Sequence, residues 1–94
     1  MMQAYTYIVE CADDTYYTGW TTNVSARVAA HNAGVGARYT RARTPVKLVF
    51  WEAYDDKLLA QRREVAIKKM TRSQKEQLVI AFNMEKRPMK DQEE

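Results

Sequence analysis

The sequence is poor in cysteine and has no long apolar run. Cys11 is the only cysteine, so the chain cannot form an internal disulfide, and it has no cluster of cysteine and histidine that would hold zinc. No apolar run approaches the length of a membrane span, and residues 1–3 lead into a strand-like segment without the apolar core of a signal peptide. We therefore expect a cytoplasmic protein that has no membrane partner.

Acidic residues are missing from the middle of the chain. Residues 15–51 contain no Asp or Glu, although the overall frequency would place four or five there. The rest of the chain carries 10 basic and 12 acidic side chains, so the positive charge is segregated. Such a stretch is typical of a surface for a polyanion such as nucleic acid; the alternative is that it only maintains solubility. The basic residues of this stretch are Arg27, Arg38, Arg41, Arg43 and Lys47.

The remaining composition is that of an ordinary globular domain. Hydrophobic residues make up 46% of the chain and charged residues 29%, and 94 residues are enough for one domain. We expect residues 1–84 to form this domain and the polar residues 85–94 to be a disordered tail.

Alternating residues predict two strands near the N-terminus, over residues 5–11 and 15–20. Tyr7 and Tyr17 share a face of the sheet only if paired residue numbers sum to an even value, as in the pair of Val9 with Tyr17. This pairing needs a loop with an odd number of residues. A three-residue loop over residues 12–14 provides it, with Asp14 in the left-handed conformation.

Helix signals follow the second strand. Thr22 or Asn23 is a suitable N-cap for a helix over residues 24–33, and Gly34 suits its left-handed end. Arg27 and His31 lie four residues apart on this helix, next to a stripe of two valines, so both can face the sheet.

The second half of the chain predicts one more strand and two more helices. We expect a basic loop over residues 34–45, a strand over 46–54 and a helix over 57–70. The segment Thr71–Gln74 is a capping box that begins the last helix. We expect the inward side chains of that helix to be Leu78, Ala81 and Phe82.

Glu64 lies on a partly apolar face of the predicted third helix, between Ala60 and Ile67. A carboxylate in that position needs a partner. A salt bridge is the ordinary explanation, and a bound cation is the functional one. The candidates for the salt bridge are Arg62, Arg63 and Lys68.

Two phenols, a guanidinium, an imidazole and one carboxylate can therefore meet at one small site. These groups can cleave a phosphodiester with the help of one divalent cation. Tyrosines on strands also pack sheets, and an interior histidine is often only a hydrogen-bonded core residue. The candidate catalytic residues are Tyr7, Tyr17, Arg27, His31 and Glu64.

The basic loop mixes Gly, Thr and Arg in a way that suits contacts to phosphate groups. A solvated basic surface is the alternative. The candidate nucleic-acid-binding residues are Arg38, Tyr39, Thr40, Arg41, Arg43 and Lys47.

In this order the residues resemble the GIY-YIG nuclease superfamily, and most of all its small single-domain bacterial branch. The resemblance covers about residues 4–80. Tyr5 stands where the name of the motif has Gly, and Thr18 replaces its Ile. The residues that carry the resemblance are Tyr5-Thr6-Tyr7, Tyr17-Thr18-Gly19, Arg27, His31-Asn32, the segment 34–45 and Glu64.

The resemblance implies an α+β fold in which helices flank a central three-stranded antiparallel sheet. It also implies hydrolysis of phosphodiesters with one Mg²⁺ or Mn²⁺, with Glu64 as the only protein ligand. Tyr7 would be the general base or would orient the water, and Tyr17 would be a second phenol at the nucleophile. Arg27 would hold the scissile phosphate, and His31 would assist by hydrogen bonding or proton transfer.

Two classes of function remain open from the sequence. One is a metal-dependent endonuclease of low intrinsic sequence specificity, acting on DNA more than RNA in repair or processing. The other is a nucleic-acid-binding or partner-binding module that is slow or inactive alone, with a protein partner that supplies targeting. Nothing in the chain resembles the cofactor cradle of a metabolic enzyme.

Overall fold

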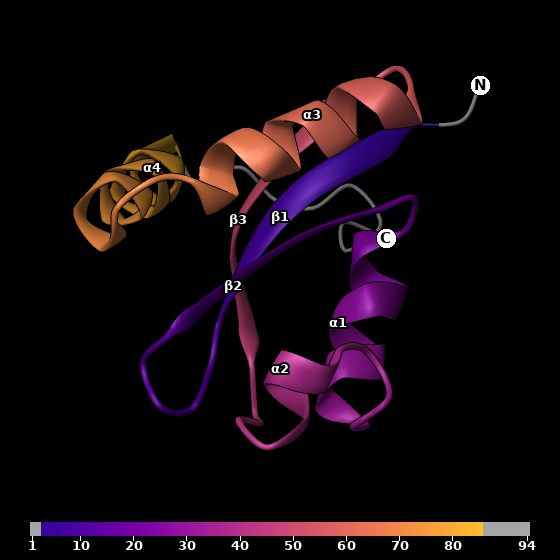
Figure 1. The fold of residues 1–94 in the computed structure, drawn as a ribbon, viewed down its shortest axis with the longest axis vertical. Helices are drawn as coiled ribbons and strands as arrows, with labels where there is room; N and C mark the ends of the chain where they lie inside the picture. Colours follow the sequence, from indigo (N-terminus) through magenta and orange to yellow (C-terminus); the bar gives the residue numbers. More distant parts are fainter. Residues whose placement is uncertain (1–2, 86–94) are drawn as a thin grey trace.

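The structure is a computed structural model that describes residues 3–85. It has the expected α+β fold, with a three-stranded antiparallel sheet between helices (Figure 1). The predicted tail, residues 85–94, lies outside the described residues except for Glu85, which belongs to the last helix. In chain order the elements are β1 (Ala4–Glu10), β2 (Tyr16–Thr21), α1 (Val24–Asn32), α2 (Arg38–Arg41), β3 (Lys47–Tyr54), α3 (Lys57–Lys68) and α4 (Arg72–Glu85).

Strand β1 is the centre of the sheet, between β2 and β3. Its alternation places Tyr7 and Val9 on one face and Thr6 and Ile8 on the other, and all four are buried. A central strand covered on both faces explains why even its threonine is inaccessible to solvent. The Thr6 hydroxyl is satisfied because it donates to the carbonyl of Ala60 in α3, at 2.7 Å.

The hairpin between β1 and β2 has the predicted register. Val9 pairs with Tyr17, and the backbone N–H of Cys11 donates to the carbonyl of Thr15 at 2.8 Å. Asp14 has the expected left-handed conformation, with φ of 68°. Because the loop is odd-numbered, Tyr7 and Tyr17 lie on the same face, as predicted.

Helix α1 covers the face of the sheet that carries the two tyrosines (Figure 1). The Asn23 side chain caps it by accepting from the N–H of Ala26, and Gly34 follows its end with φ of 83°. The helix ends at Asn32, one residue before the predicted end. Its inner side carries Val24 and His31, which are both buried.

Helices α3 and α4 cover the opposite face. Ile8, Phe50 and Ile67 form the core there, and α4 contributes Leu78, Val79 and Phe82. The predicted capping box is confirmed, since the Thr71 N–H donates to the side chain of Gln74 and the Gln74 N–H donates to the Thr71 hydroxyl. The expectation that Ala81 points inward is wrong: Ala81 is exposed, because the packed stripe of α4 runs through Val79 instead.

The basic segment is more ordered than predicted. The expected loop over residues 34–45 contains one helical turn, α2, in which the Thr40 hydroxyl donates to the carbonyl of Ala37. β3 begins one residue later than predicted, and α3 ends at Lys68 instead of residue 70. Among the described residues no helix is long and apolar enough to cross a bilayer.

Candidate active site

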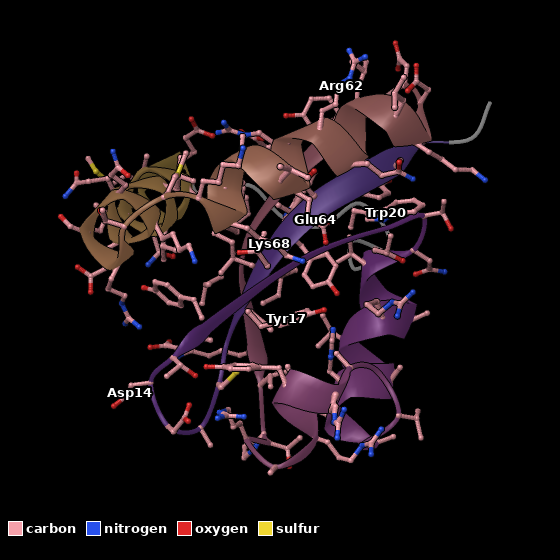
Figure 2. The ribbon with its side chains drawn as sticks, in the orientation of Figure 1. Asp14, Tyr17, Trp20, Arg62, Glu64 and Lys68 are labelled. Carbon is pink, nitrogen blue, oxygen red and sulfur yellow. The ribbon has the colours of Figure 1, made fainter. Side chains whose placement is uncertain are left out.

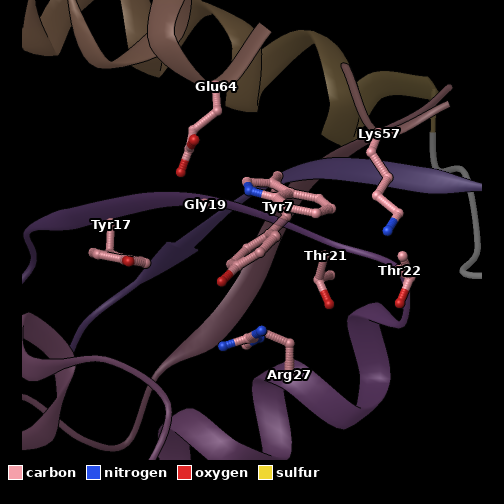
Figure 3. Close-up of a pocket in the computed structure, with 9 residues that line it drawn as sticks. Tyr7, Tyr17, Gly19, Thr21, Thr22, Arg27, Lys57 and Glu64 are labelled. Atoms are coloured by element: carbon pink, nitrogen blue, oxygen red, sulfur yellow. The ribbon is translucent and has the colours of Figure 1, made fainter. Parts of the chain in front are cut away.

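A pocket of about 430 Å³ opens between β2, α1 and α3 (Figure 3). Of the predicted catalytic residues, Tyr7, Tyr17, Arg27 and Glu64 line it. His31 does not reach the pocket, because it lies buried behind Tyr7. The fold therefore brings side chains from β1, β2, α1 and α3 together, and these elements are far apart in the sequence.

Gly19 makes room for the central phenol. It pairs with Tyr7 across the β1–β2 ladder, and the phenol ring lies directly over its Cα position. A Cβ atom at residue 19 would lie 2.6 Å from the Tyr7 hydroxyl oxygen, which is closer than van der Waals contact allows. Only glycine at residue 19 therefore permits the observed position of the phenol.

The Tyr7 phenol is protonated at neutral pH. Its side chain is only 2% exposed, and burial raises the pKa of Tyr7 well above its ordinary value. Nearby Tyr17 and Glu64 raise this pKa further, while the Arg27 guanidinium opposes the shift. A free phenolate at residue 7 is therefore not available as a base.

His31 connects the phenol to the basic segment. Its Nε2 atom lies 2.8 Å from the Tyr7 hydroxyl, and its Nδ1 atom lies 2.7 Å from the hydroxyl of Thr40. Burial lowers the pKa of His31, and the positive charge of Arg27 on the same helix lowers it further. The imidazole is therefore neutral at neutral pH and has a buried partner on each nitrogen.

Arg27 and Glu64 face each other across the pocket, with Tyr7 between them (Figure 3). Arg27 makes no ion pair with any described residue, so its charge is directed at the pocket. An unpaired guanidinium in a polar pocket is a ready site for an anion such as a phosphate.

Glu64 is paired in the structure, although it also borders the pocket. Its carboxylate lies 3.2 Å from the Lys68 ammonium, one helical turn away, and its side chain is 17% exposed. Figure 2 shows both residues on the side of α3 that faces β2, with Arg62 on the opposite side. Arg63 pairs with Glu52 at 2.9 Å. Of the salt bridges expected as an alternative for Glu64, only the one with Lys68 is present.

The donor set suits a cation that keeps most of its water. Glu64 is the only carboxylate that lines the pocket, and residues 3–85 contain no group of three or more potential metal ligands. Mg²⁺ is commonly held by one or two carboxylates together with several waters, and the pocket has room for a hydrated ion. The residues present therefore fit a Mg²⁺ or Mn²⁺ ion at Glu64.

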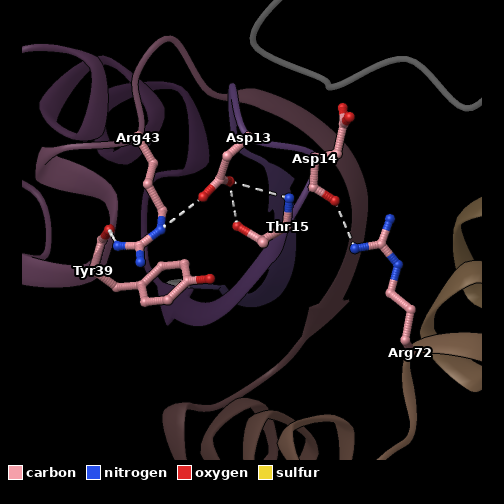
Figure 4. A network of polar contacts seen from close by, with 6 residues as sticks. All are labelled: Asp13, Asp14, Thr15, Tyr39, Arg43 and Arg72. Atoms are coloured by element: carbon pink, nitrogen blue, oxygen red, sulfur yellow. Dashed lines mark hydrogen bonds and ion pairs between the residues drawn. The ribbon is translucent and has the colours of Figure 1, made fainter.

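Two contacts hold the tip of the β1–β2 hairpin (Figure 4). On one side, the Arg43 guanidinium donates to Asp13 at 3.0 Å and to the carbonyl of Tyr39 at 2.7 Å. On the other side, Arg72 of α4 donates to the carbonyl of Asp14 at 2.6 Å. Exposed contacts of this kind contribute little to stability, so they orient the loop more than they stabilise the fold.

Arg43 also places an aromatic stack beside the pocket. Its guanidinium lies 3.9 Å from the centre of the Tyr39 ring, and the Tyr39 ring stacks on Tyr17 with a centroid distance of 6.0 Å. Tyr17 in turn lies edge-on to the His31 ring. Tyr39 thus contacts both Arg43 and Tyr17 and is still 37% exposed, so its predicted contact with nucleic acid stays a prediction.

The basic segment does not present all of its predicted contacts to solvent. Thr40 is fully buried against His31, so the expectation that it contacts nucleic acid is not met. Arg43 is engaged with Asp13 and Tyr39. Arg38 and Arg41 are exposed and make no ion pair within residues 3–85, and Lys47 is exposed with only a 4.0 Å contact to a carboxylate.

A comparison with protein families agrees with this geometry. The profile of the GIY-YIG catalytic domain matches residues 3–77 of the chain. The chain belongs to the GIY-YIG family. A UPF0213 protein of Clostridium perfringens is 56% identical to this GIY-YIG chain over 75 residues, which cover 80% of it and 81% of the relative. A UPF0213 protein of Halobacterium salinarum is 60% identical over 72 residues, which cover 77% and 94%.

Two solved structures resemble this GIY-YIG domain. The solution NMR structure of the UPF0213 protein from Bacillus halodurans is 46% identical, with a TM-score of 0.56, and the match covers 85% of each chain. A solution NMR structure from E. faecalis is 37% identical, with a TM-score of 0.59, and covers 89% of this chain and 90% of the other. Both are similar in fold over nearly the whole GIY-YIG domain.

Lys57 lines the pocket of the GIY-YIG site, although the sequence did not single it out. Three contacts within the site were also not predicted from the sequence. They are the space that Gly19 leaves for Tyr7, the approach of Gly36 to His31, and the contact of Thr40 with the imidazole. The predicted hairpin register could have revealed the space that Gly19 leaves for Tyr7. A register that pairs residue 9 with residue 17 also pairs residue 7 with residue 19. No local signal predicts the other two, since they depend on how residues 34–40 return to α1.

Proposed function

We propose that this protein is a divalent-metal-dependent endonuclease that hydrolyses phosphodiester bonds with low intrinsic sequence specificity. DNA is the expected substrate in preference to RNA, and repair or processing of DNA in the cytoplasm is the expected role. The observation that carries the proposal is the pocket of a GIY-YIG domain in which Arg27 and Glu64 face each other across Tyr7. Arg27 and Glu64, on opposite walls, can hold a phosphate and a cation side by side, and Lys57 adds a second cationic group to the lining.

In the proposed reaction, Arg27 binds the scissile phosphate and counters the charge that develops in the transition state. Its lack of an ion pair among the described residues supports this role, because no partner has to be displaced. Tyr7 contributes its neutral hydroxyl, which can orient the attacking water. Tyr17 also lines the pocket, and its side chain limits where the substrate can lie.

Glu64 is the residue that would hold the metal. A bound Mg²⁺ or Mn²⁺ supplies positive charge that polarises the attacking water and neutralises the phosphate. The Lys68 ammonium has to share or release the Glu64 carboxylate when a cation binds. Both side chains are partly exposed, so breaking this ion pair costs little free energy. Arg38, Arg41 and Lys47 offer further contacts to the phosphate backbone.

A single experiment tests the proposal. The full chain is incubated with labelled single-stranded, duplex, flap and junction DNA and with matching RNA, in Mg²⁺, in Mn²⁺ and in excess chelator. We expect metal-dependent cleavage of at least one DNA substrate, with products at many sequence positions. Absence of cleavage on the whole panel would contradict the proposal.

One observation favours a second candidate, a binding module with little activity of its own. The carboxylate of Glu64 is already paired with Lys68, which is the arrangement expected if residue 64 has only a structural role. This candidate predicts tight metal-independent binding of nucleic acid without cleavage, or activity that appears only with a protein partner that supplies targeting. The same panel, read by binding in chelator as well as by cleavage, separates the two.

A further inference from the structure

Three buried groups form a chain of hydrogen bonds that begins at the pocket and ends on a carbonyl. The Tyr7 hydroxyl lies 2.8 Å from Nε2 of His31, Nδ1 of His31 lies 2.7 Å from the Thr40 hydroxyl, and that hydroxyl lies 3.2 Å from the carbonyl of Ala37. Tyr7, His31 and Thr40 are 2%, 1% and 0% exposed. Solvent cannot replace any of these contacts, so each needs a proton of its own.

Counting protons gives the direction of the chain. A neutral imidazole has one N–H, and each hydroxyl has one O–H, so three protons serve three contacts. The carbonyl of Ala37 can only accept, and it accepts from the Thr40 hydroxyl as well as from the backbone N–H of Arg41. Nδ1 of His31 must then donate to Thr40, and Nε2 must accept from Tyr7. In the reverse direction two oxygen atoms would face each other at 3.2 Å with no proton between them.

We propose that Thr40 is a positioning residue that fixes His31 as the tautomer protonated on Nδ1. The Tyr7 hydroxyl then donates its proton inward to Nε2 and turns its lone pairs toward the pocket. The hydrogen bond made by one nitrogen of a histidine determines which nitrogen carries the proton, so removal of the Thr40 hydroxyl removes the constraint.

The segment around Gly36 prevents the ring from escaping this arrangement. A Cβ atom at residue 36 would lie 2.6 Å from Nδ1 and 2.7 Å from the backbone N of His31, so the chain closes directly over that side of the imidazole. The Tyr17 ring lies edge-on at 5.3 Å between centroids on another side. His31 is therefore held in one orientation by β1, β2 and the segment that leads into α2.

This arrangement makes Tyr7 a proton relay, a consequence that rests on the proposed function. As the water oxygen bonds to phosphorus and the P–O bond to the leaving oxygen breaks, the water proton passes to the Tyr7 oxygen. The Tyr7 proton passes to Nε2 of His31. The leaving oxygen takes a proton from solvent, and His31 later returns its extra proton to solvent through Tyr7.

The relay agrees with the state of each group. Tyr7 stays neutral throughout, as its burial requires. The imidazolium formed on His31 keeps an acceptor for both of its N–H groups, in Tyr7 and Thr40. The other groups that face His31 are Tyr17 from β2 and Arg27 from its own helix, and the charge of Arg27 favours return of the proton.

Nitrogen-15 NMR of the imidazole tests the assignment directly, because the chain has only one histidine. The full-length protein, without metal or nucleic acid, is labelled with ¹⁵N-histidine and measured at neutral pH. We expect a protonated Nδ1 and an unprotonated Nε2. A protonated Nε2, alone or together with Nδ1, would overturn the proposal. Because no substrate is used, a failure here is distinct from a failure to cleave in the panel above.

Two variants test the part played by Thr40. Thr40→Val keeps the volume but removes the hydroxyl, and we expect the spectrum to show a shift toward protonated Nε2. Turnover should fall by on the order of 100-fold, the low end of what a positioned general base contributes, with KM little changed and the pH profile displaced. Thr40→Ser should restore both the tautomer and the rate.

Thr18→Val is the matched control. Thr18 is also buried, and its hydroxyl has no hydrogen-bond partner within residues 3–85, so the same substitution there should leave the tautomer and rate unchanged. Thermal melting of each variant checks folding. If Thr40→Val folds and its His31 is still protonated on Nδ1, the proposed role of Thr40 is wrong. If Thr40→Val does not fold, the wild-type spectrum alone decides the direction of the hydrogen bonds from Tyr7 to Thr40.

Discussion

At the scale of single residues, the site depends on a few groups that the protein holds in an unusual state. His31 is neutral because it is buried next to Arg27, and Tyr7 is protonated because burial disfavours its anion. Glu64 is paired with one cationic side chain, Lys68, and borders the pocket. These states can each be tested by one substitution or one titration.

The carboxylate of Glu64 should be required for cleavage but not for binding. Glu64→Gln removes the charge that a divalent cation needs while keeping the size of the side chain, so we expect loss of turnover by at least about 1,000-fold. Binding of DNA in chelator should stay within about threefold of wild type, measured by fluorescence anisotropy. Glu76→Gln, at an exposed ion pair on α4, is the control for loss of one charge. Full activity of Glu64→Gln would place the metal elsewhere.

Stability should depend on pH through His31. Because its pKa is lower in the folded than in the unfolded chain, the unfolded chain binds more protons as the solution is acidified. The contribution of neutral His31 to the free energy of unfolding is complete above the pKa of the unfolded chain, about 6.5. It is lost as the pH falls through the pKa of the folded chain. Urea midpoints between pH 7.5 and 5 should therefore decrease, and those of His31→Gln should change less. Stability that increases on acidification would contradict the lowered pKa.

At the scale of elements, the hairpin of β1 and β2 determines whether a site can exist. The odd-numbered loop puts Tyr7 and Tyr17 on one face, and the direct pairing of Tyr7 with Gly19 gives the phenol its position. The two sides of the loop tip are held by Arg43 and Arg72, which come from distant parts of the chain. The register of one ladder thus sets the geometry of the chemistry.

Gly19→Ala should damage the site more than the fold. The added methyl group would displace the Tyr7 phenol, at a cost of about 1–3 kcal/mol in unfolding free energy, and turnover should fall by at least about 100-fold. Gly34→Ala is the matched control: its φ of 83° makes alanine unfavourable by about 1–2 kcal/mol, but nothing lies within 4 Å of the new methyl group.

Chemical denaturation and initial rates measured on both variants check this prediction. Similar losses of stability with a loss of turnover only in Gly19→Ala would support it. Equal effects of the two substitutions on turnover would show that the rate reports stability and not the position of Tyr7.

At the scale of the whole molecule, the acid-free stretch over residues 15–51 places five cations on α1, α2, the turn after α2 and the start of β3. The structure divides these five cations by role. Arg27 is in the pocket, Arg43 holds the hairpin, and the exposed cations are Arg38, Arg41 and Lys47. The number of phosphate contacts is therefore smaller than the count of basic residues.

Binding to duplex DNA should show this division. With contacts from Arg27, Arg38, Arg41 and Lys47, the slope of log K against log salt should be about −3.6, from about −0.9 per contact. Arg38→Ala and Arg41→Ala should each reduce the slope by roughly 1, for any sequence tested. Arg43→Ala should leave the slope nearly unchanged but lower the melting temperature. A slope near zero would show that the basic stretch is only a solvated surface.

Local patterns were enough to predict the strands, the hairpin parity and the helix caps, and together with the family resemblance they pointed to four of the side chains that line the pocket. Alternation, turn chemistry and helical spacing are short-range, so residues such as Asp14, Asn23 and Thr71 carry their signals within a few positions. The packing of α4 was predicted less well, since Val79 and not Ala81 packs on the sheet. A helix that is mostly exposed has no strong apolar periodicity to indicate its inner face.

The sequence by itself determined which chemical groups are available, which strand faces carry the phenols and which stretch of the chain lacks acidic residues. Only the tertiary structure decided that Thr40 is a buried partner of His31, that Arg43 supports the hairpin and that Glu64 has Lys68 as a partner. These contacts depend on how the segment between α1 and β3 returns to the sheet. The type of residue does not show whether a threonine contacts a ligand or orients a histidine. Its burial and its hydrogen bonds in the folded segment between α1 and β3 show this.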